Sequence, residues 1–286
     1  MKKFAVIDIG SNSVRLMFVA DGKVLYKSLN TTRLGEGIAQ TGCLTCAAVE
    51  RSALAVAEFY ERALQEGAER VFAFATAAVR SAKNRELFLE SVKTLCGLNV
   101  EVISGEEEAE IGILGALGKN DGGIVDVGGA STEMIVREKG EILYKKSVDV
   151  GVVRLKDLCG RDKQALQEYA KTAVAEFGCI PQANMYAIGG TATSIASILL
   201  GQKVYDGRQV TGFALTKDNL SKAVEYLKTT SPEEVSLQTC VPLKRAEVLL
   251  GGAIWLLTIV ESLGLARLIV SDADNLEGYA IKRGLL

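Results

Sequence analysis

Two short turns in this 286-residue sequence combine an aspartate with glycine and hydroxyl side chains. Asp8 is followed by Gly10-Ser11-Asn12-Ser13, and Asp126 is followed by Gly128-Gly129-Ala130-Ser131-Thr132. Glycine lets the backbone N–H groups of such a turn approach an anion, and the hydroxyls add further donors. An aspartate at the end of a strand supplies a hard oxygen ligand for Mg²⁺. The pair of turns therefore predicts a phosphate-binding cleft with a metal-binding aspartate on each side.

A third glycine turn follows a strand expected at 185–188. Here Gly189-Gly190-Thr191 precedes a helix expected near 192–200, which directs the partial positive charge of its amino end toward a possible anion. Gly190 and Thr191 are therefore candidate phosphate-binding residues. Capping of the helix by the same residues explains this turn equally well when it is taken alone.

Glu108 is the candidate general base. It lies in Ser104-Gly105-Glu106-Glu107-Glu108-Ala109, where Ser104 and Glu107 fit a capping box at a helix start. That role does not explain Glu108, which heads a stripe of glycines at 112 and 115. Glycine inside a helix costs about 1 kcal/mol relative to alanine, so this face predicts close approach by another segment. A carboxylate at such a junction is placed to accept a proton from water.

Arg80 follows a strand expected at 71–75, and a guanidinium at the carboxyl end of a strand is placed to bind phosphate. Exposure to solvent is at least as good an interpretation from position alone. The sequence contains no histidine, which excludes Ser-His-Asp catalysis and metal-histidine hydrolases. The pair Cys43 and Cys46 has no second pair to complete a zinc site, so reduced thiols are expected.

Charge and hydropathy argue against several classes of protein. The net charge is −2, with Lys and Arg spread along the chain, which argues against binding to nucleic acid or a membrane surface. The amino terminus has no signal-peptide pattern, and the uncharged run at 248–260 is too short to span a bilayer. We therefore expect a cytoplasmic protein.

An internal repeat organises the elements that position these turns. The stretch at 8–27 matches that at 126–145 without a gap, and every matched pair is 118 residues apart. The identical pairs are Asp8/Asp126, Gly10/Gly128, Ser13/Ser131, Gly22/Gly140, Leu25/Leu143, Tyr26/Tyr144 and Lys27/Lys145. Such agreement at turn residues indicates a duplication.

Each copy predicts a strand triplet followed by alternating helices and strands, which is an α/β layer architecture. Strands are expected at 4–9, 71–75, 100–103, 124–127, 185–188 and 268–270, and helices near 46–66, 85–96, 163–177, 192–200, 217–228 and 244–264. We expect two domains facing a cleft, one comprising 1–117 plus a terminal helix within 274–286, the other 118–273.

These motifs resemble the exopolyphosphatase/guanosine pentaphosphate phosphohydrolase (Ppx/GppA) family, within the actin-like ATPase superfamily of ribonuclease H-like folds. The matching stretches run in the family's order and cover essentially the whole chain: VIDIGSNSVRLMFV, TRLGEG, ATAAVRSAKN, VISGEEEAE, VDVGGASTEM and SDADNLEG. The resemblance implies two duplicated domains, hydrolysis of terminal phosphoanhydride bonds with Mg²⁺, and a homodimer.

The resemblance also implies roles for individual residues. Glu108 matches the base, Glu133 an acid near the reacting centre, and Asp8 and Asp126 the metal-associated aspartates. The implied phosphate-binding positions are Ser11, Asn12, Ser13, Arg80, Gly128, Gly129, Ser131 and Thr132.

The sequence departs from the family at two places that bear on the site. Ala130 replaces a glycine of the second turn, and Ala273-Asp274-Asn275-Leu276 replaces the usual Gly-Ala-Leu-Arg, which loses a cation. Because the sequence stops at Leu286, we also expect the further helical domains of longer relatives to be absent. The reaction is expected to survive these changes, which bear on chain-length preference and processivity. The expected function is release of terminal phosphate from inorganic polyphosphate, with hydrolysis of guanosine pentaphosphate as the alternative. An ATP-dependent kinase or ATPase and a non-catalytic phosphate binder are the alternatives from other classes.

Overall fold

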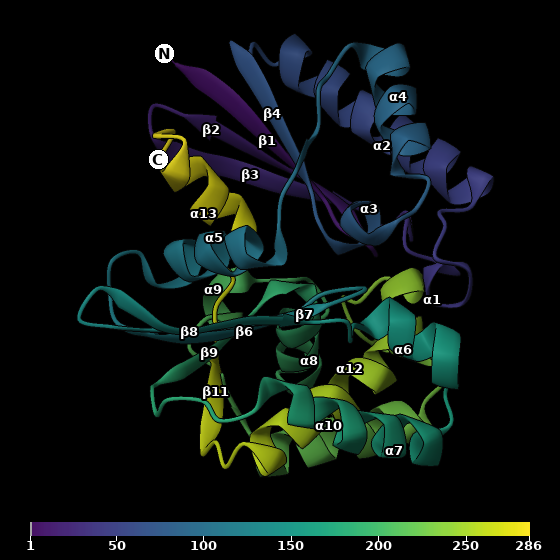
Figure 1. The fold of residues 1–286 in the computed structure, drawn as a ribbon, viewed down its shortest axis with the longest axis vertical. Coiled ribbons are helices and arrows are strands. Elements are labelled where there is room, and N and C mark those ends of the chain that lie inside the picture. Colours follow the sequence, from purple (N-terminus) through teal and green to yellow (C-terminus); the bar gives the residue numbers. More distant parts are fainter. Residues whose placement is uncertain (1) are drawn as a thin grey trace.

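The computed structural model describes residues 2–286 and contains two β-sheets with helices packed against them (Figure 1). The first sheet has the order β3-β2-β1-β4-β5, with β1 (Lys3–Ile9), β2 (Val14–Ala20), β3 (Lys23–Asn30), β4 (Arg70–Ala75) and β5 (Glu101–Val102). The second has the order β10-β11-β9-β6-β7-β8, with β6 (Gly122–Val127), β7 (Thr132–Glu138), β8 (Glu141–Val148), β9 (Met185–Ile188), β10 (Ala214–Thr216) and β11 (Arg267–Val270).

The helices follow the strand triplets. Those before β6 are α1 (Ile38–Thr41), α2 (Cys46–Gln65), α3 (Ala77–Ser81), α4 (Arg85–Cys96) and α5 (Gly105–Leu117). Those after it are α6 (Val152–Cys159), α7 (Lys163–Ala173), the 3₁₀ turn η1 (Val174–Phe177), α8 (Gly189–Leu199), α9 (Gly207–Val210), α10 (Lys217–Thr229), α11 (Pro232–Gln238), α12 (Leu243–Ser262) and α13 (Asn275–Lys282). Between Lys2 and Leu286 no helix is both long and apolar enough to cross a membrane.

The duplication is visible in the strand registers. Asp8 pairs with Arg15 across β1 and β2, and Asp126 pairs with Glu133 across β6 and β7. The register also shifts at the same relative place in both copies, between 18 and 19 and between 136 and 137. Both hairpins turn through a non-glycine residue of positive φ and a glycine, Asp21-Gly22 and Lys139-Gly140. The predicted α/β fold of two duplicated halves is confirmed.

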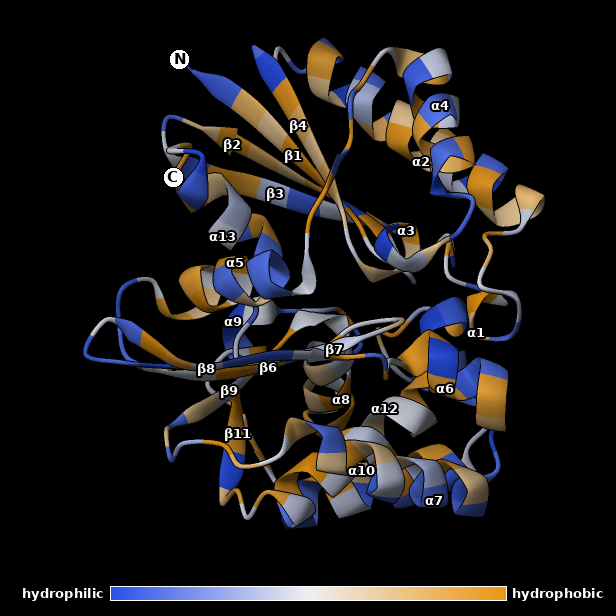
Figure 2. Ribbon diagram, viewed as in Figure 1, coloured by the Kyte–Doolittle hydropathy of each residue, from blue (hydrophilic) through white to orange (hydrophobic). Residues whose placement is uncertain are grey.

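Each sheet has its own apolar core. The central strands β1 and β6 are buried almost throughout, which fits their apolar sequences between covered faces. In the first half α2 turns its Ala, Val and Phe positions toward the sheet, and hydrophilic residues lie on its outer face (Figure 2). The apolar helix α12 is buried on most sides in the second half, with Trp255 fully covered. It is a core helix, as predicted.

Helices α5 and α13 pack against each other between the two sheets (Figure 1). A Cβ atom on Gly115 would lie 1.9 Å from the carbonyl oxygen of Asp274, and one on Gly278 would lie 1.6 Å from that of Ile111. Only glycine allows this backbone contact. The close approach predicted from the glycine stripe below Glu108 is confirmed, and the partner segment is α13. The terminal helix also packs on the first sheet, because Leu276 and Tyr279 share a core cluster with Phe74.

Several elements differ from the expectations. The helix expected near 163–177 ends at Ala173 and continues as the turn η1, and the strand expected at 100–103 has only two residues. The helix expected near 192–200 begins earlier, at Gly189. The sequence reasoning did not predict α6, α11 or β10.

Candidate active site

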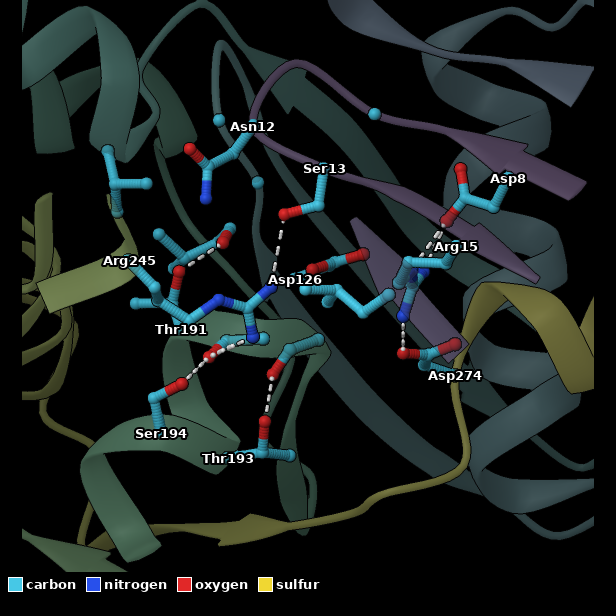
Figure 3. Close-up of a pocket in the computed structure, with 18 of the residues that line it drawn as sticks. Asp8, Asn12, Ser13, Arg15, Asp126, Thr191, Thr193, Ser194, Arg245 and Asp274 are labelled. Carbon is cyan, nitrogen blue, oxygen red and sulfur yellow. Dashed lines mark hydrogen bonds and ion pairs between the residues drawn. The ribbon is translucent and has the colours of Figure 1, made fainter. Parts of the chain in front are cut away.

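A cavity of about 370 Å³ lies between the two halves, within the size range of small-molecule sites. The carboxyl ends of β1 and β6, the start of α8 and the start of α13 all reach it (Figure 3). Eleven residues predicted to be functional line it: Asp8, Ser11, Asn12, Ser13, Glu108, Asp126, Gly128, Gly129, Ser131, Gly190 and Thr191.

The two Asp-x-Gly turns have the same geometry. Gly10 N–H donates to the Ser13 carbonyl at 3.0 Å, and Gly128 N–H donates to the Ser131 carbonyl at 3.0 Å. The turns also touch, since a Cβ on Gly129 would lie 2.6 Å from that of Ser11. The repeat therefore places two N–H-rich turns side by side at one end of the cavity, an arrangement suited to phosphate oxygens.

The third turn contributes the amino end of α8. Gly189 has φ +78° and Ile188 provides no side-chain cap, so the first N–H groups of the helix have no capping oxygen. Glycine is required at 189 because a Cβ there would lie 2.4 Å from Asp126 Oδ1. The hydroxyl of Thr191 donates to the Val127 carbonyl at 2.8 Å and ties the helix to the end of β6. The helix amino end is thus held beside Asp126 and points at the cavity.

Asp8 and Asp126 are both buried but have different partners. Asp8 Oδ2 accepts from Arg15 Nε at 3.0 Å, whereas Asp126 Oδ2 accepts from Asn275 Nδ2 at 2.8 Å. Burial raises the pKa of Asp8, and the Arg15 charge opposes this shift. Burial, followed by the nearby Glu108 and Asp274 charges, raises the pKa of Asp126 to about 8. Both carboxylates therefore lie where a cation would stabilise their ionised form.

The donor set fits a hard divalent cation. Asp8 Oδ1, Asn12 Oδ1 and Asn275 Oδ1 are buried and have no hydrogen-bond partner. Within residues 2–286, no three Asp, Glu, Cys or His side chains are grouped as a complete metal centre. Two protein carboxylates completed by water and substrate phosphate are the usual ligand set of Mg²⁺. Asp8 and Asp126 could hold such an ion.

Glu108 is buried at the end of the first turn of α5 and contacts Arg80. Its Oε2 accepts from Arg80 Nη1 at 2.8 Å, and the same nitrogen donates to the Ile103 carbonyl at 3.1 Å. Burial raises the pKa of Glu108 well above its usual value, the Glu133 charge adds to the shift, and Arg80 opposes it. A carboxylate with a raised pKa beside a phosphate-binding cavity has the properties of a general base.

Glu133 lies behind the cavity wall and is fully covered. Its Oε1 accepts from the Ser131 hydroxyl at 2.6 Å and from the Ser147 hydroxyl at 2.7 Å, and lies 3.8 Å from Arg80 Nη2. Burial and the Asp126 charge raise the pKa of Glu133 to about 7, while the two hydroxyls oppose the shift. Arg80 therefore bridges two carboxylates, Glu108 and Glu133.

Three predicted site residues do not line the cavity: Arg80, Thr132 and Glu133. The Arg80 side chain is 24% exposed, and its guanidinium is directed at Glu108 rather than at the phosphate turns. The Thr132 hydroxyl accepts from Trp255 Nε1 at 2.8 Å and donates to the Val150 carbonyl. Thr132 thus belongs to the core, and the phosphate-binding role expected for its side chain is corrected.

Among the cavity residues that the sequence did not predict are Arg15 and Arg245, and Asp274 and Asn275 stood out only as departures from the family pattern. Arg245 Nη2 lies 3.4 Å from Ser13 Oγ, and Nη1 lies 3.4 Å from the Gly190 carbonyl (Figure 3). Burial and the nearby Arg15 charge lower its pKa to about 10, so it stays a cation at neutral pH. The repeat offered a signal for Arg15, because Glu133 occupies the equivalent position.

Comparison with known proteins finds a family of relatives. The family model described as "Ppx/GppA phosphatase family" matches residues 16–283. "Exopolyphosphatase 2" of Mycobacterium tuberculosis is 30% identical, over 98% of this chain and 98% of that protein. "Guanosine-5'-triphosphate,3'-diphosphate pyrophosphatase" of Photobacterium profundum is 29% identical, over 99% of this chain and 58% of that protein.

Solved structures show the same fold. The crystal structure of the Aquifex aeolicus Ppx/GppA family member aligns with a TM-score of 0.78 at 31% identity, over 99% of this chain and 98% of that one. An exopolyphosphatase-like protein aligns with a TM-score of 0.89 at 25% identity, over 99% and 100% of the two chains. Sequence motifs, cavity geometry and these matches together show that the chain belongs to the Ppx/GppA phosphatase family.

Proposed function

We propose that this protein is an exopolyphosphatase-type phosphohydrolase that releases terminal phosphate from inorganic polyphosphate. The observation that carries the proposal is the convergence of two N–H-rich turns, the uncapped start of α8 and the buried Glu108 on one cavity. Donors from three directions suit a tetrahedral anion, and the carboxylate is placed to act on water. The similarity to the Mycobacterium tuberculosis exopolyphosphatase supports polyphosphate as the substrate.

The charge of the cavity supports a requirement for Mg²⁺ or another divalent cation. Its lining contains five carboxylates and three cationic side chains: Asp8, Glu108, Asp126, Asp272 and Asp274, with Arg15, Lys27 and Arg245. An excess of acidic over cationic side chains weakens the binding of a polyphosphate, and further positive charge would strengthen it. A bound cation would neutralise phosphate charge and polarise the scissile bond. Asp8 and Asp126 are the proposed ligands.

The chain's own residues then have distinct tasks. The N–H groups of the turns at 10–13 and 128–131, with Gly190 and Thr191 at the start of α8, bind the terminal phosphate. Arg245 is a cation beside the first and third of these turns. Glu108 orients a water and takes its proton as the water attacks the terminal phosphorus. The bond from that phosphorus to the bridging oxygen breaks, and the shortened polyphosphate leaves. Arg80 favours the ionised form of Glu108 that this step needs.

A specific observation favours a second candidate substrate, guanosine pentaphosphate. One part of the cavity lining is apolar, with Val241, Pro242, Val248 and Leu249, and has an aromatic neighbour, Tyr205. Contact with apolar side chains would add to the binding free energy of a nucleoside base but not to that of a polyphosphate chain. The similarity to the Photobacterium profundum protein supports this alternative.

Release of inorganic phosphate distinguishes the candidates. The purified protein is incubated with long-chain polyphosphate, guanosine pentaphosphate or ATP, each with Mg²⁺ and with EDTA. We expect Mg²⁺-dependent release from polyphosphate, with slower release from the guanosine nucleotide. Faster release from guanosine pentaphosphate supports the alternative, and preferential turnover of ATP indicates an ATPase. Tight binding of substrate without any release identifies a non-catalytic binder.

We further propose that the protein is a cytoplasmic homodimer. Six cysteines without a disulfide suit a reducing compartment. Sedimentation of the purified protein measures the oligomeric state, and a monomer at micromolar concentration would contradict the dimer.

A further inference from the structure

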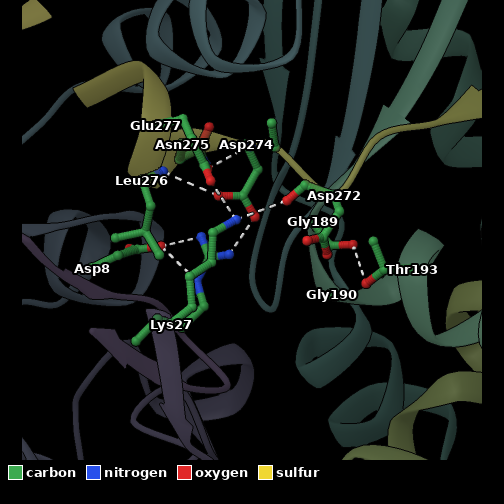
Figure 4. A network of polar contacts seen from close by, with 12 residues as sticks. Asp8, Lys27, Gly189, Gly190, Thr193, Asp272, Asp274, Asn275, Leu276 and Glu277 are labelled. Atoms are coloured by element: carbon green, nitrogen blue, oxygen red, sulfur yellow. Dashed lines mark hydrogen bonds and ion pairs between the residues drawn. The ribbon is translucent and has the colours of Figure 1, made fainter. Parts of the chain in front are cut away.

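The start of α13 places a carboxylate on a cleft arginine. Arg15 Nη1 contacts Asp274 Oδ2, while its Nε and Nη2 contact Asp8 (Figure 3). Figure 4 shows the same Asp8 and Asp274 together with Lys27. All three guanidinium nitrogens therefore donate to the protein's own acids. The Arg15 side chain is still 19% exposed and lines the cavity, so it lies within reach of a ligand there.

Asp274 is held as an anion. Its side chain is only 6% exposed, and burial alone would raise its pKa, but Arg15 and Lys27 lower it below its usual value. Lys27 in turn pairs with Glu277 at 2.5 Å and donates to the Asp272 carbonyl at 3.0 Å. Asp274 thus presents a fixed negative charge to the cavity at neutral pH.

The second arginine of the cavity is in the opposite state. Within residues 2–286, the polar contacts of the Arg245 guanidinium are to uncharged oxygens, Ser13 Oγ and the Gly190 carbonyl, both at 3.4 Å. Arg15 is near enough to lower the pKa of Arg245, after the larger effect of burial. The cavity therefore holds two neighbouring guanidinium groups, of which one is available to a phosphate and the other is occupied by internal carboxylates.

Helix capping does not explain the charge of residue 274. Asp274 Oδ1 accepts from the Leu276 N–H at 3.1 Å and completes a capping box with Glu277. Asparagine and serine cap helices about as well as aspartate. The cap therefore needs the oxygen of this side chain, whereas only the contact with Arg15 uses its negative charge.

We propose that Asp274 is a specificity-determining residue, whose carboxylate occupies Arg15 in place of a phosphate and so limits the affinity of the cleft for short polyphosphate anions. The proposal rests on the proposed function for its ligand class but does not require turnover. An arriving anion must displace Asp274 or leave Arg15 unused. Removing the charge at 274 while keeping the cap should therefore strengthen anion binding.

Tripolyphosphate binding, measured by isothermal titration calorimetry in EDTA, tests this without hydrolysis. We expect Asp274→Asn to lower the dissociation constant about tenfold, as for one added hydrogen bond to a charged group. Asp274→Ser keeps a capping oxygen and should show the same gain, which covers the case in which the first variant folds poorly. Asp218→Asn, at an exposed site in the first turn of α10, changes the net charge equally and should bind within about twofold of wild type.

A double-mutant cycle assigns the effect to Arg15. In the Arg15→Gln background, adding Asp274→Asn should change the dissociation constant less than about twofold. The proposal is overturned if Asp274→Asn binds no tighter than wild type, if it fails to bind, or if the gain persists without Arg15. Failure of the proposed function would instead appear as absent phosphate release by wild type, whatever these binding ratios are.

Discussion

Four carboxylates around the cleft have raised pKa values for one main reason, which is burial: Asp8, Glu108, Asp126 and Glu133. Their mutual repulsion adds to the effect, and Arg15 and Arg80 oppose it. A folded protein without a bound cation therefore retains protons here that the unfolded chain would release. The base role proposed for Glu108 needs the ionised carboxylate. The positive charge of a bound cation should therefore both stabilise the folded protein and favour that ionised form.

The pH dependence of stability tests this accumulation of charge. The pKa of Asp126 rises from 3.8 to about 8 on folding, so the folded state binds this proton more tightly throughout the interval. The free energy of unfolding should therefore decrease as pH rises from about 4 to about 8. We expect calorimetry in EDTA to give a Tm several degrees lower near pH 8 than near pH 5.5.

Two comparisons test whether Asp126 causes the decrease of Tm with rising pH. Asp126→Asn should flatten the Tm profile, and so should Mg²⁺ added to the wild-type protein. A Tm that rises with pH between about 5.5 and 8, or an equal slope in Asp126→Asn, would contradict the burial argument.

Arg80 should set the acidic limb of the pH–rate profile. Because its charge lowers the pKa of Glu108, Arg80→Gln should let that pKa rise further. We expect the acidic limb of kcat to move about one unit toward alkaline pH, the lower end of the range for losing an opposite charge. Arg85→Gln, which removes a half-exposed guanidinium from the next helix, should leave the profile unchanged. An unshifted limb in Arg80→Gln would mean that Arg80 does not set the pKa of Glu108, and would leave the phosphate-binding role implied by the family resemblance as the alternative.

At the scale of elements, two helices carry the parts of the site across the junction. Helix α5 bears Glu108, and α13 begins with Asp274 and Asn275, which contact Arg15 and Asp126. Their backbones meet at Gly115 and Gly278. The crossing therefore fixes Glu108, the proposed base, relative to Asp8 and Asp126, the proposed metal ligands.

Gly115→Ala should disrupt this crossing. The added methyl would lie 1.9 Å from a carbonyl oxygen of α13, and backbone cannot move aside as a side chain can. We expect a loss of about 1–3 kcal/mol in the free energy of unfolding, measured in urea, with a fall in kcat. Gly251→Ala in α12 is the matched control, because its Cβ would meet Leu155 Cβ at 3.3 Å. Equal stability of the two variants would show that the crossing tolerates displacement.

The parts of the site that depend on local sequence patterns could be predicted from the sequence. The repeat located both Asp-x-Gly turns, and the glycine stripe predicted a close contact on α5. It could not name α13 as the partner, since the contact joins segments about 160 residues apart. Thr132 was misplaced because successive strand residues face opposite sides. Ser131 and Glu133 share one side and hydrogen-bond at 2.6 Å, so Thr132 points into the core.

At the scale of the molecule, a second set of contacts joins the halves away from α5 and α13. Arg33 pairs with Glu247 of α12 at 2.7 Å, and Lys244 Nζ donates to the Thr31 carbonyl at 3.1 Å. Glu247 also pairs with Lys156. Arg33 has φ +52°, a conformation that non-glycine residues rarely adopt. These contacts form a clasp (Thr31, Arg33, Lys156, Lys244, Glu247) between the two halves.

We expect the two halves to open and close around the cavity and the clasp to favour the closed form. Weakening the clasp should therefore reduce the fraction of protein in the closed form. A lower closed fraction raises the apparent dissociation constant in proportion, so Glu247→Gln should raise KM by up to about fivefold. Hydrogen exchange of the segment 31–40 should become faster, while kcat changes less than KM. Glu261→Gln removes a more exposed pair, with Lys217, and should leave both unchanged. Unchanged KM together with unchanged exchange would show that the clasp does not control closure.

In the proposed reaction, Glu108 activates water for attack on phosphate bound between the two halves. The most direct measurement compares phosphate release from polyphosphate by wild type, Glu108→Gln and Glu107→Gln at saturating Mg²⁺. Glu107 is the neighbouring carboxylate, whose capping role glutamine can also fill. We predict that Glu108→Gln lowers kcat by about 10²–10⁴, the usual contribution of a general base, with KM nearly unchanged, and that Glu107→Gln resembles wild type. A kcat for Glu108→Gln within about threefold of wild type would contradict the claim and place the base elsewhere.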